Sequence, residues 1–315
     1  MDSYNYSMNV YITLDIGGTN TRCAVFSQGN LEPILSEKIQ THTKDQNAES
    51  RIISLIRSVW KDDYNVLGIC AAAPGSIDIR SGTVILAPNI PGWKNLKFKK
   101  ILQENFDTNI FINNDARLAA YGEWKQGAGI GHHTLLYFTI STGIGGGVII
   151  QDTLLEGDFG IATEMGHIYL VDDGPLCGCG KHGHFEALSS GTAIENYINQ
   201  KIDEGEKSVL EKGSSARDAA EAAKKGDPLA VAAFDRAGFY LGRGIANYLH
   251  IFNPSCVIFG GGVAQSGELL LVPFQKSLKK HVLSQKYLEN LKIQMAELGD
   301  DVGLVGALEY LKDQI

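Results

Sequence analysis

Runs of apolar and β-branched residues that end in glycines predict strands followed by glycine-rich turns. Residues 10–26, VYITLDIGGTNTRCAVF, have the pattern strand, Gly-Gly turn, strand, which predicts a hairpin. Residues 135–150, LLYFTISTGIGGGVII, repeat the pattern about 125 residues later. A further strand is predicted in SCVIFGGGVA, residues 255–264. The repeated hairpin indicates two related α/β halves.

Apolar residues at helical spacing predict helices between these strands. Residues 50–61, SRIISLIRSVWK, have such spacing, with Ser50 as a candidate N-cap. Residues 111–124, FINNDARLAAYGEW, are typical of a strand end, a polar turn and a helix start. A long buried helix is expected from residue 228 up to Pro254.

The repeated hairpin also predicts the domain organisation. We expect an N-terminal α/β domain of residues 1–120 and a larger C-terminal α/β domain of residues 121–302 that carries the Cys/His-rich loop. The final helix, about residues 303–315, is expected to pack back on the first domain. The boundary rests on the repeat, because no linker or low-complexity tract separates the halves.

Composition excludes several classes of protein. The chain has 315 residues, 44% of them hydrophobic and 20% charged, which is typical of a globular protein. Its net charge of −8 argues against a nucleic-acid partner. Neither a membrane-spanning apolar run nor a signal-peptide pattern is recognisable, so no membrane partner is expected. Five cysteines, an odd and sparse number, favour a reducing compartment, and we expect the cytoplasm.

Three glycine-rich turns are candidates for binding phosphate. Glycines let the backbone approach a ligand and turn N–H groups toward anions. DIGGT (15–19) adds a carboxylate and a hydroxyl, TGIGGG (142–147) adds a hydroxyl, and GGG (260–262) follows a buried strand. The alternative is that each is only a tight hairpin. None of them fits the P-loop or the Rossmann fingerprint.

Five motifs in one order resemble the ROK family (repressors, open reading frames and sugar kinases). They are DIGGT, NNDA at 113–116, STGIGGG at 141–147, EMGH at 164–167 and CGCGKHGHFE at 177–186. The resemblance runs from about residue 10 to about residue 312. It implies a two-domain actin/hexokinase-like (ribonuclease H-like) α/β fold with an interdomain cleft. It also implies phosphoryl transfer from ATP to a hexose hydroxyl.

The resemblance assigns the general base to Asp115, the Asp of NNDA, which would accept the hydroxyl proton. The alternative is that Asp115 caps the following helix. The family's sugar-binding set corresponds here to Asn89, Asn114, Asp115, Glu164, His167 and Glu186. Asn89 could instead be a turn residue between two prolines, and Glu164 a solvated loop charge.

The resemblance also implies an ATP site. Asp15 would hold Mg²⁺ through water, because magnesium keeps several waters and takes few carboxylates. The residues facing the phosphates and the adenosine would be Asp15, Gly17, Gly18, Thr19, Thr142, Gly143, Gly145, Gly261 and Gly262.

The family binds one structural zinc through a His of EMGH and three cysteines in the pattern C-x-C-x4-C-x-E. Here Cys177 and Cys179 match, whereas His184 replaces the third cysteine. With His167 these residues would form a closed Cys2His2 site, which has no open position for chemistry. One His167 nitrogen would bind zinc while the other ring N–H faces a sugar hydroxyl. His182 is a rival ligand, and a surface loop with free thiols is the alternative.

These observations predict an ATP-dependent hexose kinase that phosphorylates a 6-hydroxyl. Glucose is the favoured acceptor because APNIPGW, residues 87–93, resembles the sugar loop of the family's glucokinases. Mannose, fructose, N-acetylglucosamine and N-acetylmannosamine stay open. A non-kinase ATPase or a sugar-sensing regulator are alternatives from other classes. About ten residues precede the first strand, which argues against a repressor with an added DNA-binding domain. We expect a homo-oligomer, either a dimer or a tetramer.

Overall fold

The computed structural model describes residues Met8–Ile315 and divides into two compact units. Unit 1 contains the chain up to Ile130 together with Leu154–Thr163 and Glu297–Ile315. Unit 2 contains Gly131–Thr153 and Glu164–Ala296. This division differs from a boundary at residue 120, because helix α3 (Asp115–Gln126) runs through that position without a break and stays in unit 1.

Unit 1 is built on a five-stranded sheet with the strand order β3-β2-β1-β4-β8. Strand β1 pairs antiparallel with β2, which confirms the predicted first hairpin, and parallel with β4. Strand β4 in turn pairs parallel with β8. The bounds are β1 (Met8–Ile16), β2 (Asn20–Ser27), β3 (Leu35–Gln40), β4 (Tyr64–Ala73) and β8 (Asn109–Asn114).

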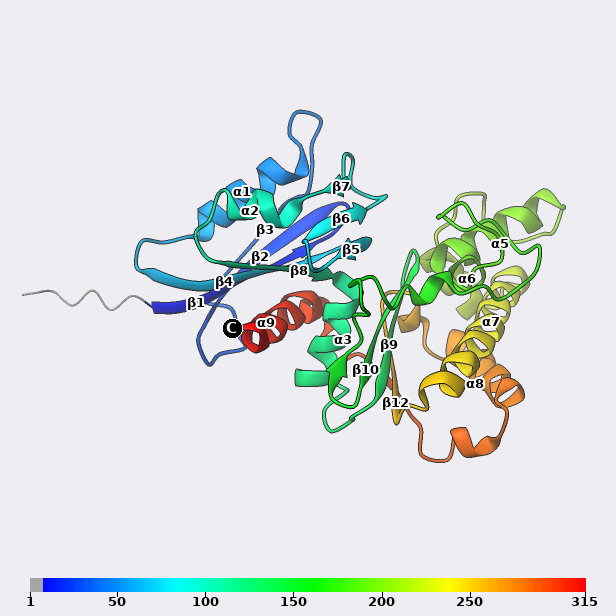
Figure 1. The fold of residues 1–315 in the computed structure, drawn as a ribbon. Helices are drawn as coiled ribbons and strands as arrows, with labels where there is room; N and C mark the ends of the chain where they lie inside the picture. Colours follow the sequence, from blue (N-terminus) through cyan, green and yellow to red (C-terminus); the bar gives the residue numbers. More distant parts are fainter. Residues whose placement is uncertain (1–7) are drawn as a thin grey trace, which may run out of the picture. The chain divides into compact units, whose positions relative to one another are not determined.

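Helices cover both faces of this sheet (Figure 1). Helices α1 (Ala48–Val59) and α2 (Phe98–Gln103) lie on one face, and α3 and α9 (Val302–Gln314) on the other. Helix α9 packs against β1 and β4. A small antiparallel sheet joins β5 (Ser76–Asp78), β6 (Thr83–Leu86) and β7 (Lys94–Leu96).

One predicted cap is wrong. The N-cap of α1 is Asn47, whose side chain accepts the backbone N–H of Ser50 at 3.0 Å, so Ser50 itself lies inside the helix. An Asn three residues ahead of a Ser can take the same capping role, and here it starts the helix earlier than the apolar spacing indicated.

Unit 2 repeats the sheet topology of unit 1. Its strand order is β11-β10-β9-β12-β13, again a hairpin followed by two strands parallel to its first strand. The predicted internal repeat is therefore confirmed at the level of topology. The bounds are β9 (Leu135–Ile140), β10 (Ile144–Ile150), β11 (Thr153–Leu154), β12 (Cys256–Gly260) and β13 (Lys292–Met295).

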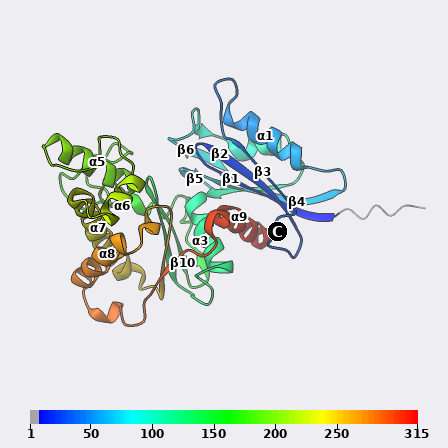
Figure 2. The same cartoon turned by 180° about the vertical axis from the view of Figure 1, so that it is seen from behind.

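A layer of helices packs beside the sheet of unit 2, as both views show (Figures 1 and 2). The predicted long buried helix is α7 (Pro228–Phe252), which ends at Asn253 in the left-handed conformation. It crosses helix α8 (Glu268–His281) closely, because a Cβ on Gly242 would lie 2.5 Å from the Phe274 carbonyl oxygen. The other helices are α4 (Glu186–Ser189), α5 (Gly191–Asp203) and α6 (Ala216–Lys224). Within Met8–Ile315 no helix is both long enough and apolar enough to cross a bilayer.

Candidate active site

The start of helix α3 places Asp115 directly after the end of strand β8. The N-cap is Asn114, whose side-chain oxygen accepts the N–H of Arg117 at 3.0 Å. The amide nitrogen of Asn114 donates to the Gly75 carbonyl at 3.0 Å. The alternative role considered for Asp115, capping this helix, is therefore wrong: Asp115 is the first helical residue, and its Oδ1 accepts the N–H of Ala116 at 2.8 Å.

Buried polar contacts fix this junction on both sides of Asp115. Asn113 is fully buried, and its amide nitrogen donates to Glu156 Oε1 at 3.0 Å. The hydroxyl of Tyr310 donates to the same oxygen at 2.9 Å. Burial, with Glu156 nearby, raises the pKa of Tyr310, so its hydroxyl stays a donor. Arg117, also buried, donates to the Gly160 carbonyl at 2.8 Å. The segment Leu154–Thr163 thus holds the strand end and the helix start in place.

The first glycine-rich turn, Gly17–Thr19, joins β1 to β2. It is closed by a hydrogen bond from the Gly17 N–H to the Asn20 carbonyl at 2.9 Å. The Thr41 hydroxyl donates to the Gly17 carbonyl at 2.6 Å. A Cβ on Gly18 would lie 2.9 Å from the Cβ of Asn89, so the loop that carries Asn89 rests on this turn. Within unit 1 the structure therefore brings a predicted sugar-binding residue next to the predicted phosphate turn.

Asp15 lies at the entrance of this turn, beside the guanidinium group of Arg22. Its Oδ2 accepts from Arg22 at 3.1 Å, and Arg22 also pairs with Asp301 at 2.8 Å. Burial raises the pKa of Asp15, although the hydrogen bond and the charge of Arg22 oppose that rise. A Cβ on Gly303 would lie 2.8 Å from the Asp15 carboxyl carbon, so the start of α9 packs on this carboxylate.

The second glycine-rich turn, between β9 and β10, contacts Glu186. Glu186 Oε2 accepts the N–H of Ile144 at 2.9 Å, and a Cβ on Gly143 would lie 2.3 Å from the same oxygen. A Cβ on Gly166, in the EMGH stretch, would lie 3.3 Å from the Glu186 Cβ. Glu164 accepts the N–H of His167 through its backbone carbonyl at 3.0 Å. Three of the predicted motifs therefore meet around Glu186.

A cavity of about 410 Å³ in unit 2 contains part of the predicted nucleotide set. Thr142 and Gly262 line it together, whereas Gly145 lies inside β10 and pairs with Thr139. Gly261 turns the chain after β12 with φ +85°, and a Cβ there would lie 2.4 Å from the Ile140 carbonyl oxygen. The N-terminal residues of α5 and α6 also line the cavity, which favours an anionic ligand.

Sequence reasoning missed the contribution of helix α6 to this cavity. Helix α6 adds two cations and one carboxylate to the lining, those of Arg217, Lys224 and Glu221. Glu195 of α5 adds a second carboxylate. Glu195 Oε1 also accepts the N–H of Ala216 at 3.0 Å, which holds the start of α6 against α5. The pattern Ser215-x-x-Asp218 forms a full capping box and could have located this helix start from the sequence.

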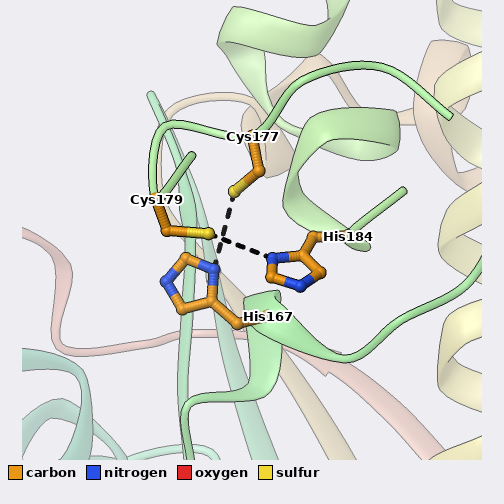
Figure 3. Close-up of side chains that lie close together, drawn as sticks. All are labelled: His167, Cys177, Cys179 and His184. Atoms are coloured by element: carbon orange, nitrogen blue, oxygen red, sulfur yellow. Dashed lines mark hydrogen bonds between the residues drawn. The ribbon is translucent and has the colours of Figure 1, made fainter. Parts of the chain in front are cut away.

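The four predicted zinc ligands come together in unit 2 (Figure 3). One ligand atom from each of His167, Cys177, Cys179 and His184 lies within 4.8 Å of all the others. Cys177 Sγ lies 3.6 Å from His167 Nδ1, and Cys179 Sγ lies 3.2 Å from His184 Nδ1. The side chains point toward one another from the short 3-10 turn η1 (Met165–His167) and from the loop before α4.

The donor set fits zinc. Four N and S atoms around a metal at 2.0–2.3 Å stand roughly 3.3–3.8 Å apart in a tetrahedron, so small side-chain shifts suffice. Burial with the nearby His167 lowers the pKa of His184, which favours the neutral imidazole that binds metals, whereas burial raises the pKa of the Cys177 thiol to about 12, so its thiolate would form with the bound metal. Glu186 Oε1 lies 3.5 Å from Cys177 Sγ, which links the cluster to the second glycine-rich turn. The rival ligand, His182, lies outside the cluster and contacts the Gly174 carbonyl at 3.0 Å through Nδ1.

Comparison with known proteins gives the family. The model of the ROK family matches residues 11–314, nearly the whole chain. The chain belongs to the ROK family. The predicted resemblance is confirmed, and so is the fold class, the α/β fold of the actin/hexokinase-like superfamily.

Several ROK proteins align with most of this chain. The glucokinase of Streptomyces coelicolor is 33% identical over 316 residues, covering 97% of this chain and 98% of its own. A crystal structure of a ROK glucokinase from Streptomyces griseus, in complex with glucose and AMPPNP, is 33% identical with a TM-score of 0.80. It covers 96% of this chain and 99% of its own. The xylose repressor of Bacillus subtilis is 35% identical over 230 residues, which are 73% of this chain and 57% of the repressor.

Proposed function

We propose that this ROK protein is an ATP-dependent hexose kinase that transfers the γ-phosphate of ATP to the 6-hydroxyl of glucose. The observation that carries the proposal is the start of α3. Asn114 caps the helix there, and Asp115 is held beside it by buried contacts that join β8, Leu154–Thr163 and α9. The end-to-end similarity to glucokinases supports the same conclusion.

Asp115 is the proposed general base. Phosphoryl transfer needs in-line positioning and an acceptor for the hydroxyl proton. A carboxylate within hydrogen-bond reach of the 6-hydroxyl takes that proton as the bond to phosphorus forms. The Asn114 cap and the hydrogen bonds of Asn113 and Tyr310 to Glu156 hold the backbone around Asp115. None of these hydrogen bonds involves the Asp115 carboxylate. The site therefore does not need to reorganise the helix start for the reaction.

We assign the remaining hydroxyls of the sugar to amide, carboxylate and imidazole side chains. They are those of Asn89, Asn114, Glu164, His167 and Glu186. Such groups accept and donate in pairs, so they discriminate between sugars that differ in one hydroxyl. The contact of Glu186 with Ile144 couples the acceptor side to the glycine-rich turn of unit 2.

ATP is assigned to the cavity of unit 2 and to the two glycine-rich turns. Thr142 and Gly262 line that cavity, and Arg217 and Lys224 supply positive charge beside it. Mg²⁺, when bound to the phosphates, neutralises the charge that develops on them. Asp15 would hold it through water, and Arg22 keeps that carboxylate oriented. Zinc at the Cys2His2 cluster would be structural, and would fix the loop that carries His167 and Glu186.

A second function, sugar-sensing regulation, has one observation in its favour. Xylose repressors align with about three quarters of this chain, but the chain spans little more than half of their length. A regulator would bind sugar and leave ATP intact. A kinase consumes ATP when sugar is present, so turnover distinguishes the two.

The proposal is tested by measuring ADP formation from Mg²⁺-ATP against a panel of hexoses. The panel holds glucose, mannose, fructose, N-acetylglucosamine and N-acetylmannosamine. We expect glucose to give the highest kcat/KM, with little ADP in the absence of sugar because a closed kinase excludes water. ADP formation that no sugar stimulates would favour an ATPase, and sugar binding without ADP would favour a regulator.

A glycine substitution tests the role assigned to Glu186. In Gly143→Ala the new methyl group would meet Glu186 Oε2 at 2.3 Å, so the carboxylate must leave the Ile144 N–H. We expect kcat/KM for the sugar to fall about 10–100-fold, with a loss of about 1 kcal/mol in unfolding free energy from the broken hydrogen bond. Steady-state kinetics and thermal unfolding measure both effects.

The matched control is Gly178→Ala in the zinc loop, where a Cβ would meet nothing within 4 Å. It should leave kcat/KM within about twofold of the parent. Equal activity in Gly143→Ala and Gly178→Ala would contradict the assignment of Glu186.

A further inference from the structure

The chain passes between the two units at four points: after residues 130, 153, 163 and 296. Any motion between two units changes the backbone torsions at such crossings, and hinges are usually a few residues at the ends of elements. Two of the crossings, after Ile130 and after Ala296, are 166 residues apart in sequence (296 − 130). Both are anchored to one side chain.

That side chain is Glu123, near the end of helix α3. It is a fully buried carboxylate (0% exposed), and its hydrogen-bond donors are backbone N–H groups. Oε2 accepts from Ala128 at 2.9 Å, just before the first crossing. Oε1 accepts from Glu297 at 3.0 Å and from Leu298 at 2.9 Å, just after the other. One carboxylate therefore joins the segment that leaves unit 1 to the segment that returns to it.

At the crossing after Ala296, two successive backbone N–H groups donate to acceptors in different units. The N–H of Ala296 donates to the Phe259 carbonyl of strand β12, inside unit 2, at 2.9 Å. The next N–H, that of Glu297, donates to Glu123, inside unit 1. Any rotation about this crossing is thus confined to a few dihedral angles between two fixed hydrogen bonds.

The first crossing is similarly short. The Glu123 backbone carbonyl accepts the N–H of Gly127 at 3.1 Å and of Gly129 at 2.8 Å, so the chain is held up to residue 129. Gly131, the first residue of unit 2, has φ +83°, and a Cβ there would meet nothing within 4 Å. A glycine in this conformation can change its dihedral angles without a steric penalty.

The same helix carries the proposed base at its other end. Asp115 and Glu123 are eight residues apart on α3, about 12 Å along the axis. Gly122 and Gly306 bring α3 and α9 into close contact, since a Cβ on Gly306 would lie 1.9 Å from the Leu118 carbonyl oxygen. Helix α3 is thereby held rigidly within unit 1 between its two functional ends.

We propose that Glu123 is a positioning residue: it anchors to helix α3, which carries Asp115, the segments that flank the crossings after Ile130 and Ala296, so that only a few backbone torsions at each crossing stay adjustable. The inference rests on the proposed kinase function for its effect on rate. Its structural part, the anchoring of residues 128 and 297–298, does not depend on that function.

A carboxylate suits this role because its hydrogen-bond partners, the backbone N–H groups of Ala128, Glu297 and Leu298, are all donors. Glu123→Gln keeps the shape but replaces one acceptor oxygen with an amide nitrogen that also donates. At least one of the bonds to Ala128, Glu297 and Leu298 is then replaced by two donors facing each other. The anchor loosens while the apolar core of unit 1 is unchanged.

The test compares Glu123→Gln with the parent in three measurements: kcat, the Kd of an ATP analogue, and amide hydrogen exchange. We expect kcat to fall at least tenfold, while the Kd for the analogue stays within about twofold, because the hydrogen bonds of Glu123 involve none of the residues assigned to ATP. Exchange should accelerate at residues 128–130 and 297–298 and stay unchanged in the strands of the core.

The matched control is Glu309→Gln. Glu309 is another buried acid of unit 1, and it pairs with Lys312 rather than with either crossing. Its kcat and its exchange at residues 128 and 297–298 should match the parent. An equal loss of kcat in both variants, or parent-like kcat in Glu123→Gln despite accelerated exchange at both crossings, would overturn the proposal.

Gly131→Ala provides a second variant that leaves the buried carboxylate in place. A side chain at φ +83° meets no neighbouring atom but strains the backbone locally, so it restricts the torsions of this residue, and we expect a kcat at least threefold below the parent with unchanged exchange in the core. A parent-like kcat would contradict the hinge. If the parent itself phosphorylates no sugar, the proposed function fails. The exchange measurement then still decides the anchor: unaltered exchange at both crossings in Glu123→Gln overturns it.

Discussion

Asp115→Asn is expected to lower kcat for sugar phosphorylation by about 10³-fold, within the range that general-base catalysis contributes. The amide has nearly the same shape as the carboxylate but cannot take the hydroxyl proton. Because Asn114 caps α3, the substitution leaves the start of the helix intact. Thermal stability and the Kd for the sugar should therefore stay close to those of the parent. Coupled ADP assays and titration calorimetry measure these quantities.

Asp107→Asn is the matched control, an exposed acid in the loop before β8 of the same unit. It should retain the kcat of the parent. A kcat for Asp115→Asn within tenfold of the parent would exclude Asp115 as the base. A loss of kcat accompanied by a large drop in the unfolding temperature would instead point to a structural role at the start of α3.

Removal of the Cys2His2 cluster is the second large effect. His184→Ala takes one of four ligands from the group His167, Cys177, Cys179 and His184, and we expect zinc content to fall from about one ion per chain to near zero. Because the loop also carries Glu186, kcat/KM for the sugar should fall at least tenfold. Elemental analysis after purification without chelator, together with steady-state kinetics, measures both.

His182→Ala is a sharp control because it lies two residues away in the same loop. His182 contacts the Gly174 carbonyl and lies outside the four-residue cluster, so this variant should keep its zinc. Zinc retained by His184→Ala but lost by His182→Ala would identify His182 as the ligand. A parent chain without zinc would remove the metal from the account and leave a loop with free thiols.

Local patterns in the sequence predicted much of the fold. The two glycine-tipped hairpins are β1–β2 and β9–β10, and the apolar spacing of residues 228–254 is helix α7. Such patterns are set by neighbours along the chain, through strand alternation, turn chemistry and helical periodicity. The grouping of His167, Cys177, Cys179 and His184 was predicted from the family resemblance and not from local pattern, although three of the four lie within eight residues of one another.

Contacts between distant residues were not predictable in this way. In the sequence AAYGEWKQ, Glu123 has the appearance of an ordinary helix residue, yet two of its three partners lie 174 and 175 residues further along the chain. The same is true of the Glu156 contacts with Asn113 and Tyr310, which depend on the return of Leu154–Thr163 to unit 1. The expected interdomain cleft concerns the arrangement of the two units and stays a prediction.

Identification of the reaction product shows whether this chain phosphorylates a hexose. The parent chain is incubated with Mg²⁺-ATP and glucose, and phosphorus and proton NMR follow the reaction. We expect glucose 6-phosphate in amounts equal to the ADP formed, and no free phosphate. ADP that accumulates with free phosphate and without a sugar phosphate would contradict it, and would make the protein an ATPase.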